Sequence, residues 1–215
     1  MKLYTRSASP YSVRVLASLA LKGISVELVG EPKEGTRSAE FLAINPLGKM
    51  PVLVLENDGA IAESLVILEF LEDRFPERSL RPREAFRLAQ MRLAGRVIEQ
   101  QVDGALLAVV MLVVSKSTDK NAIRDADAVL NEALTIFTQF WQPGPYAFGS
   151  EPTILDCLML PVLTILQICS DARGHDFIEK FPEIVAYQKV LAHHPQLSVL
   201  AVELAQAMAA EMHKH

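Results

Sequence analysis

The sequence predicts an α/β unit followed by an all-helical bundle, a fold class of α/β plus all-α. Up to about Pro76, the short β-rich segments KLYT, SVELV and PVLVL alternate with helical patterns. From Pro82 onward, apolar residues recur at spacings of three and four, which favours helices throughout. Half of the 215 residues are hydrophobic, which is enough for one large domain or two small ones with cores of their own.

The elements of the first half follow one another in a simple order. A strand at 2–5 precedes a helical pattern at 11–23, and a second strand follows at 25–29. The strand at 51–55 leads through the turn signal ENDG to a helical pattern at 63–75. This order predicts a βαβ unit followed by a hairpin and a helix.

The second half consists of long helical patterns, of which the clearest lie at 87–114 and 125–141. The join falls in FPERSLRPREA, where two prolines and several charges interrupt both patterns. We therefore expect a first domain at 1–77 and a second at 84–215. An apolar run at 104–114 is shorter than the roughly 20 residues needed to cross a bilayer, and it is predicted to be a buried helix.

Charge and cysteine usage exclude several classes of function. The net charge is -5 and basic residues form no cluster larger than a pair, so a nucleic-acid groove is not expected. The start MKLYTRSASP lacks the apolar segment of a signal peptide, and we expect a cytoplasmic protein without membrane contact. Cys157 and Cys169 form no CxxC pair and have no clustered histidines, so neither a disulfide framework nor a metal site is predicted. A small neutral or anionic partner is favoured.

The stretch SASPYSVRV, residues 7–15, marks the start of the first helix. Pro10 suits the first helical position, and Ser9 before it is a preferred N-cap. A hydroxyl at this place also lies beside free backbone N–H groups and the positive end of the helix dipole, which favour an anion such as a thiolate. The cap and the anion site are compatible interpretations.

A second informative stretch is NPLGKMPVLVLENDGAIAES, residues 45–64. Pro51 opens an apolar strand, where proline is tolerated only at the first residue or at an edge. A plain trans proline and a cis Met50–Pro51 bond both remain open at this point. The final Glu-Ser precedes another helix, so Ser64 is a candidate cap, a candidate carboxylate ligand, or both.

Together these motifs resemble the cytosolic glutathione transferase superfamily. The resemblance covers essentially the whole chain: a first strand followed by SPYSVRV, then NPLGKMPVL, then AESLVILEFLEDRFPE and an all-helical second half. The position of Ser9 before the proline is similar to that of the serine in the serine-type classes tau and zeta. The resemblance implies a thioredoxin-like, glutathione-binding N-terminal domain of order βαβ-α-ββα, joined to a helical C-terminal domain. Thr153 and Asp156 of PTILDC resemble the capping box of the core helix, which we interpret as structural.

The resemblance implies that Ser9 is the catalytic residue, whose hydroxyl hydrogen-bonds the glutathione sulfur. Its physical task is to stabilise the thiolate over the thiol, so that the sulfur is a better nucleophile near neutral pH. Ser12 is the alternative, and Ser7 precedes the helix too early. Neither Tyr4 nor Tyr11 matches the tyrosine of the tyrosine-type classes. No cysteine stands at the Ser9 position, which disfavours disulfide-exchange chemistry.

The other matched positions are implied to hold the rest of glutathione, the expected co-substrate, with no metal. Met50 would offer its backbone N–H and C=O to the cysteinyl part, with Pro51 as a cis-proline. Glu63 would face the γ-glutamyl ammonium, and Ser64 the carboxylate. Lys49 matches a lysine that reaches the glycyl carboxylate in some classes, and a surface charge is the other interpretation.

The function implied by the resemblance is that of a glutathione transferase, which conjugates the thiolate to a small hydrophobic electrophile. A glutathione-dependent isomerase of the maleylacetoacetate isomerase type is the alternative, because Ser12, Arg14 and Val15 fit the SxRV pattern of the zeta class. A third hypothesis is a non-catalytic relative that binds a protein partner, and it predicts no affinity for glutathione.

The resemblance also implies where the electrophile binds and how the chain assembles. Ligand pockets favour domain interfaces, and in the family the first helices of the second domain line the electrophile site, here the apolar stretch around Val102 to Val113. The family usually forms twofold dimers through the helix at 63–75 and the first helix of the second domain. A homodimer with a role in detoxification is therefore expected.

Overall fold

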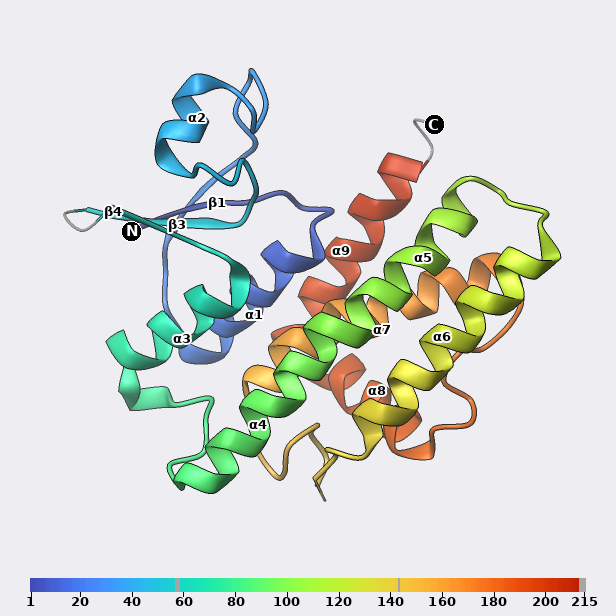
Figure 1. Cartoon of the computed structure of the whole chain (residues 1–215). Coiled ribbons are helices and arrows are strands. Elements are labelled where there is room, and N and C mark those ends of the chain that lie inside the picture. The colour runs from blue at the N-terminus through green and yellow to red at the C-terminus, as the bar shows by residue number, and fades with distance from the viewer. Residues whose placement is uncertain (57–58, 143, 213–215) are drawn as a thin grey trace.

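The computed structural model describes residues 1–56, 59–142 and 144–212, in which a four-stranded sheet and its helices precede a helical bundle (Figure 1). The first half contains β1 (Lys2–Tyr4), α1 (Pro10–Lys22), β2 (Glu27–Val29), α2 (Ala39–Ile44), β3 (Val52–Leu55), β4 (Gly59–Ala62) and α3 (Ser64–Arg74). The second half contains α4 (Ala85–Val97), α5 (Asp103–Val114), α6 (Lys120–Thr138), α7 (Ile154–Arg173), α8 (Pro182–His193) and α9 (Leu197–Met212). The predicted class, α/β plus all-α in the order βαβ-α-ββα, is confirmed.

The sheet has the strand order β2-β1-β3-β4. Strand β1 runs parallel to β2 and antiparallel to β3, which pairs antiparallel with β4. Leu3 of β1 faces Leu53 of β3, and both side chains are fully buried because these two strands are central. Helices α1 and α3 cover one side of the sheet and α2 the other (Figure 1). Residues 57 and 58 of the predicted ENDG turn lie outside the described residues.

Helix α1 begins as its sequence predicts and ends at Lys22. Pro10 is its first residue, and the Ser9 hydroxyl accepts a hydrogen bond from the backbone N–H of Ser12 at 3.3 Å. Gly23 ends the helix with φ 68°, a left-handed conformation that glycine adopts without a clash at Cβ. Its buried side chains pack against α3 and α7, so α1 contacts both halves of the protein.

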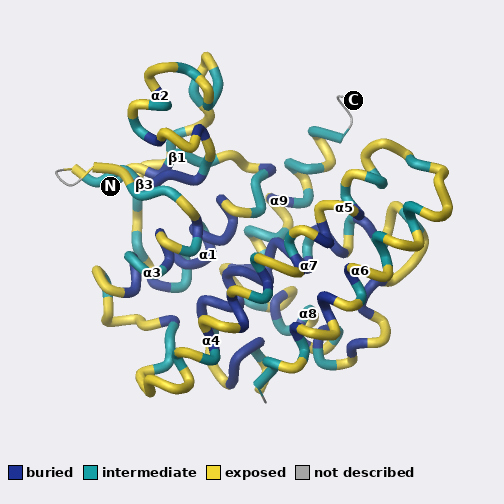
Figure 2. The backbone as a smooth tube through the Cα atoms, viewed as in Figure 1, coloured by how far each residue is buried: buried dark blue, intermediate teal, exposed yellow. Residues whose placement is uncertain are grey.

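Helix α7 is the centre of the helical half, and most of its residues are buried (Figure 2). Its start is stabilised by the Asp156 carboxylate, which accepts hydrogen bonds from the backbone N–H of Thr153 at 2.6 Å and from the Thr153 hydroxyl at 2.9 Å. The same carboxylate accepts from the backbone N–H of Ala147 at 3.1 Å. The structural interpretation of Thr153 and Asp156 as a capping box is confirmed.

The prediction of a buried helix at 104–114 is only partly right. In α5, Val109 is fully buried, whereas Leu107 and Met111 are 58% and 59% exposed. The reason is that apolar residues occupy the whole circumference of this helix, while α6 and α7 cover only part of it. Helical periodicity could not reveal which side is covered, because there is no polar face.

Two described helical segments, Ala85–Val114 and Ile154–Arg173, are long and apolar enough to cross a membrane by length and composition alone. A buried core helix passes the same test, and the second segment is α7, whose apolar window is 78% buried inside the protein. The corresponding window of the first segment is 28% buried, since it includes the uncovered side of α5.

A buried ion pair joins α1 to α3. Lys22 Nζ lies 2.6 Å from Glu72 Oε1 and donates to the carbonyl oxygen of Arg78 at 2.8 Å. The second carboxylate oxygen of Glu72 accepts from the Ser79 hydroxyl at 2.8 Å and from the backbone N–H of Leu80 at 3.0 Å. Both charged side chains are withdrawn from water, so these contacts replace their hydration. They bind two helices to the segment that leads into the second half.

We predict that Glu72→Leu destabilises the protein by about 3–5 kcal/mol, because it leaves the Lys22 ammonium buried without a counter-ion. The measurement is the free energy of unfolding from urea titration. In the double variant with Lys22→Met the loss should be smaller, since no charge is left unpaired. An exposed pair serves as the control: Asp125→Asn, beside Arg124, should change the free energy by at most about 0.5 kcal/mol. Equal losses in the single and double variants would contradict the prediction.

Candidate functional site

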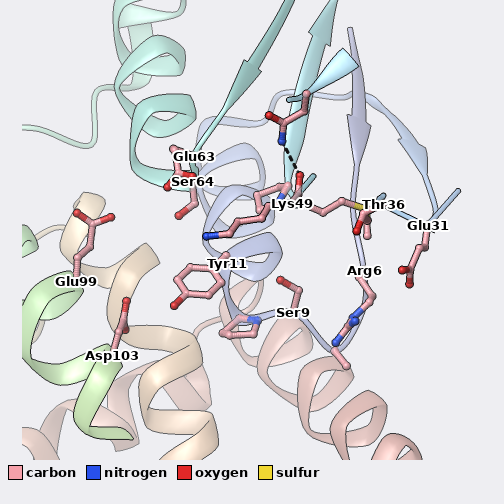
Figure 3. A pocket seen from close by; sticks show the side chains of 15 residues that line it. Arg6, Ser9, Tyr11, Glu31, Thr36, Lys49, Glu63, Ser64, Glu99 and Asp103 are labelled. Atoms are coloured by element: carbon pink, nitrogen blue, oxygen red, sulfur yellow. Dashed lines mark hydrogen bonds between the residues drawn. The ribbon is translucent and has the colours of Figure 1, made fainter. Parts of the chain in front are cut away.

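The N-termini of α1 and α3 open on one cavity of about 550 Å³ between the two halves of the protein (Figure 3). It is lined by Arg6, Ala8, Ser9, Pro10, Tyr11, Glu31, Thr36, Asn45, Lys49, Met50, Pro51, Glu63, Ser64, Glu99 and Asp103. Every residue proposed from the sequence for glutathione, except the alternative Ser12, is in this lining. Three separate stretches of the first half thus line one cavity. Its volume is in the range expected for a small-molecule pocket.

Ser9 and Ser12 differ in their access to the cavity. The Ser9 hydroxyl accepts from the backbone N–H of Ser12, which leaves its own hydrogen free to donate into the cavity. Ser12 is fully buried, and its hydroxyl accepts from the backbone N–H of Arg6 at 3.3 Å. Its side chain therefore supports the loop between β1 and α1 from behind the lining.

The segment Lys49–Pro51 reaches the cavity through a fixed turn. The Met50–Pro51 peptide bond is cis. The buried side chain of Asn45 donates to the carbonyl oxygen of Lys49 at 2.8 Å, and its Oδ1 accepts from the backbone N–H of Leu47 at 3.1 Å. Sequence reasoning did not assign Asn45, although Asn-Pro followed by glycine is a turn signal that pointed to it. Asn45 thus sets the path of the backbone before the cis bond.

Two cations lie among the described lining residues, Lys49 and Arg6. Arg6 Nη2 is 3.4 Å from Glu211 Oε2 near the end of α9, so the C-terminal helix reaches the rim of the cavity. The Lys49 ammonium has no ionic partner among the residues that the structure describes. Lys49 is therefore the lining cation without an ion pair in the described part of the chain, and it suits a carboxylate in the cavity.

Glu63 and Ser64 connect β4 to α3 with almost no loop. Glu63 is the residue before the helix and has φ 68°, an unusual conformation for a residue with a side chain. Ser64 is the first helical residue and is only 5% exposed. The cap interpretation of Ser64 is therefore wrong, because Glu63 holds that position and makes no side-chain cap bond. The direct passage from strand to helix leaves the N–H groups of α3 beside the cavity.

Among the described lining residues, the helical half contributes Glu99 and Asp103, and Asp103 is the single member of the stretch expected around Val102 to Val113. Val102 itself is fully buried. The five residues Ile98–Val102 form a π-helical turn, in which the backbone N–H of Asp103 donates to the carbonyl oxygen of Ile98. Such turns change which residues face outward, and they occur often at functional sites. The wall opposite Ser9 therefore carries two carboxylates, and the apolar side chains expected from this stretch are not among the described lining residues.

Asp103 is held by Arg14 of α1. Arg14 Nη2 lies 2.6 Å from Asp103 Oδ1, and the Arg14 side chain is 1% exposed. Among the described residues, neither Nε nor Nη1 of Arg14 has a hydrogen-bond partner, but the guanidinium lies 4.9 Å from the centre of the Tyr11 ring. Burial raises the pKa of the Asp103 carboxyl, and the charge of Arg14 opposes that rise.

Tyr11 covers this ion pair and is 44% exposed toward the cavity. Burial of its hydroxyl raises the pKa of Tyr11, and the Asp103 carboxylate raises it further, so the phenol stays protonated at neutral pH. Sequence reasoning gave Tyr11, Glu99 and Asp103 no role in the site. The sequence offered one signal for Asp103: it stands directly before the apolar run at 104–114, and a carboxylate buried there needs a partner.

The cysteines lie away from the cavity. Cys157 and Cys169 are buried in α7, and both are free thiols. Burial raises the pKa of Cys169 to about 11 and that of Cys157 well above its ordinary value, so both stay protonated near neutral pH. Their interpretation as buried thiols is confirmed. Within residues 1–56, 59–142 and 144–212, no group of three or more His, Cys, Asp or Glu side chains could hold a metal ion.

Comparison with known families matches both halves of the chain. Residues 3–79 match the family described as glutathione S-transferase, N-terminal domain, and residues 120–187 match the glutathione S-transferase, C-terminal domain. The two matches follow one another in the order in which the sheet and the helical bundle follow one another. The first match covers the sheet and its helices, and the second covers α6, α7 and part of α8 within the helical half.

Individual relatives agree with these matches. The chain is 31% identical over 166 residues to glutathione S-transferase 1 of Dianthus caryophyllus, covering 75% of each chain. It is 27% identical to the maleylacetoacetate isomerase of Pseudomonas aeruginosa, covering 91% of this chain and 92% of that protein. The fold is similar to the tau class glutathione S-transferase of mango, Mangifera indica, with a TM-score of 0.82, 22% identity, and coverage of 98% and 97% of the two chains.

Proposed function

The chain belongs to the glutathione S-transferase family, and from this we propose that it binds glutathione as the thiolate and conjugates it to a small electrophile. One observation carries the proposal. A single cavity is lined by three stretches that are far apart in the sequence: Ser9, the segment Lys49–Pro51, and the pair Glu63 and Ser64. Each of them offers a group that one part of glutathione requires.

In this proposal Ser9 is the catalytic residue. Its hydroxyl donates to the glutathione sulfur, at the positive end of the α1 dipole. Both interactions favour the thiolate over the thiol, and they lower the pKa of the bound sulfur. Ser12 is the weaker candidate, because its buried hydroxyl does not line the cavity.

The remaining lining residues are proposed to hold the charged ends of the tripeptide. Ser64, with the N–H groups that start α3, suits the γ-glutamyl carboxylate, and Glu63 suits the ammonium on the same carbon. Met50 next to the cis Pro51 offers backbone groups to the cysteinyl part. Lys49 suits the glycyl carboxylate.

The reaction then needs little further chemistry from the protein. The sulfur electron pair forms a bond to the electrophilic carbon, and the leaving group departs with its electron pair or a neighbouring π bond accepts the charge. The protein lowers the barrier by stabilising the thiolate and by placing it next to the electrophile. The electrophile is proposed to lie between Ser9 and the wall formed by Glu99 and Asp103.

Several wider features belong to the same proposal. We place the domain boundaries at 1–77 and 84–215, and we expect a cytoplasmic protein with a role in detoxification. A homodimer through α3 and the start of the second half is supported by the exposed apolar side chains Val66, Phe86 and Leu93 on α3 and α4. These side chains are 52–68% exposed in the single chain.

A glutathione-dependent isomerase is the second candidate, because the chain is similar to a maleylacetoacetate isomerase over most of its length. The SxRV pattern does not distinguish the two functions, since Ser12 and Arg14 are both buried and stabilise the fold. Turnover of maleylacetoacetate without net consumption of glutathione would favour the isomerase. Turnover of an alkyl or aryl halide with loss of the thiol would favour the transferase.

Calorimetric titration with reduced glutathione tests the binding part of the proposal. We expect binding, and an ultraviolet pH titration of the complex should show a sulfur pKa below that of the free thiol, because Ser9 and the α1 N-terminus stabilise the anion. The absence of binding would remove the enzymatic proposal and favour a protein-binding relative. Binding with an unshifted sulfur pKa would exclude thiolate stabilisation.

We predict that Ser9→Ala lowers kcat by about a hundredfold, by analogy with the loss of one donor to a reacting anion, and leaves the affinity for glutathione nearly intact. The measurement is steady-state kinetics together with the bound sulfur pKa, which should rise. Because Ser9 also caps α1, the matched control is Ser38→Ala, which removes the same type of cap bond from α2. Unchanged kcat in Ser9→Ala, with a large loss in Ser12→Ala, would transfer the role to Ser12.

We predict that Ser64→Ala weakens glutathione binding by roughly 1–3 kcal/mol, the value of a hydrogen bond to a charged group. The measurement is the dissociation constant from calorimetry. Ser18→Ala is a suitable control, because it removes a fully buried hydroxyl of α1 that does not line the cavity. Equal affinities in all three proteins would show that Ser64 does not bind the ligand.

A further inference from the structure

We propose that Glu99 determines which electrophiles the cavity accepts, because its carboxylate favours small electrophiles that carry a positive charge and disfavours those that carry a carboxylate. Alkyl and benzyl halides with an ammonium group belong to the favoured class. The inference rests on the proposed function, because it requires glutathione to be bound as the thiolate at Ser9.

Glu99 lies on the wall that faces the reacting sulfur. It lines the cavity from the helical half, within the π-helical turn Ile98–Val102. In Figure 3, Glu99 and Asp103 lie on one side of the cavity and Arg6 on the other, with Ser9 between them. An electrophile that approaches the sulfur from the helical half therefore passes Glu99.

Of the two carboxylates on this wall, Glu99 is the one that remains open to a ligand. Asp103 is bound at 2.6 Å by Arg14, whose side chain is buried. Glu99 Oε2 accepts from Arg96 at 2.8 Å, but the Arg96 side chain is 55% exposed, so water weakens this pair. No described residue donates to Glu99 Oε1. This oxygen is available to a cation or an N–H donor in the cavity.

Tyr11 gives a second reason to expect a cation on this side. Burial raises the pKa of Tyr11 most, and the charge of Asp103 raises it further. The charge of Glu99 acts in the same direction, so its negative field reaches the Tyr11 hydroxyl inside the cavity. The Tyr11 ring is 44% exposed, and aromatic rings attract ammonium groups through their π electrons. A ring beside a carboxylate therefore suits a cationic group.

Lys49 lines the same cavity and opposes this preference only while glutathione is absent. In the proposed complex, the Lys49 ammonium binds the glycyl carboxylate of glutathione, which neutralises its charge before the electrophile reacts. The bound thiolate adds a negative charge beside Ser9. The electrophile then approaches two negative groups, the sulfur and Glu99, and both attract a cation.

A substitution at a benzylic carbon tests the charge preference without involving the charged group in the chemistry. The thiolate electron pair forms the bond to the benzylic carbon, and bromide leaves with the electron pair of the C–Br bond. The charged group on the opposite side of the ring gains and loses no bond. Its effect on the rate therefore reports the electrostatic environment in the cavity.

The experiment compares three benzyl bromides that carry a trimethylammonium, a nitro or a carboxylate group para to the reacting carbon. The measured quantity is kcat/KM at saturating glutathione, divided by the rate constant of the uncatalysed reaction to correct for intrinsic reactivity. We expect Glu99→Gln to lower it about fivefold for the cation, as for a partly screened ion pair, and to raise it by a similar factor for the carboxylate. The value for the nitro compound and the affinity for glutathione should not change.

Two further variants control the comparison. Glu132→Gln removes an exposed carboxylate of α6 outside the cavity, and it should change none of the three values. Arg96→Gln removes the cation that competes for Glu99, so it should raise kcat/KM for the trimethylammonium compound. The advantage of the cation should also decrease as the salt concentration rises.

The other outcomes overturn the inference. Equal changes with all three bromides would mean that Glu99 only supports the wall, and a lower affinity for glutathione would mean that it acts on the tripeptide. A preference for the cation that persists in Glu99→Gln would assign it to another residue. Turnover of the nitro compound by the unsubstituted protein, without preference for the cation over the carboxylate, would exclude the substrate class and leave the transferase intact. Absence of glutathione binding would instead overturn the proposed function, and the role of Glu99 with it.

Discussion

The buried ion pair between Lys22 and Glu72 is the constraint on which the rest of the structure depends. Lys22 is the last residue of α1 and Glu72 lies in the last turn of α3, so the pair fastens the two helices at the ends away from the cavity. Two charges are removed from water here, and hydrogen bonds to Arg78, Ser79 and Leu80 satisfy their remaining groups. Because Leu80 also accepts from the start of α7, one cluster sets both the spacing of the helices and the joining of the two halves.

The consequence for the site is that two helix N-termini open on one cavity. Ser9 and Ser64 lie at these ends, where the positive ends of the helix dipoles favour anions. The facing wall carries the carboxylates of Glu99 and Asp103, each held by an arginine. The cavity thus has one side suited to the charged groups of a small peptide and one side that presents the hydroxyl of Tyr11.

Sequence reasoning succeeded where local chemistry decides the structure. The N-cap Ser9 and the βαβ unit, hairpin and helix of the first half followed from residue type and spacing, because capping and periodicity depend on near neighbours in the chain. The resemblance, and not a local pattern, implied the additional helix α2. Sequence reasoning failed where it had to predict which side of a helix is buried. Helix α5 is apolar all round, so its pattern could not show that Leu107 faces solvent while Val109 is buried. Of the two roles left open for Ser64, the cap of α3 is wrong, because the direct passage from β4 into the helix puts Glu63 at that position.

The sequence by itself determined the fold class, the elements of the first half apart from α2, and the motifs that meet at the cavity, since each depends on contacts within a short stretch of chain. Only the tertiary structure decided the wall opposite Ser9. Arg14 and Asp103 are 89 positions apart, and their pairing across the two halves arises because burial of either charge alone is unfavourable. Glu99 and Asp103 line the cavity at the π-helical turn formed by Ile98–Val102. No local pattern in these residues predicts the turn.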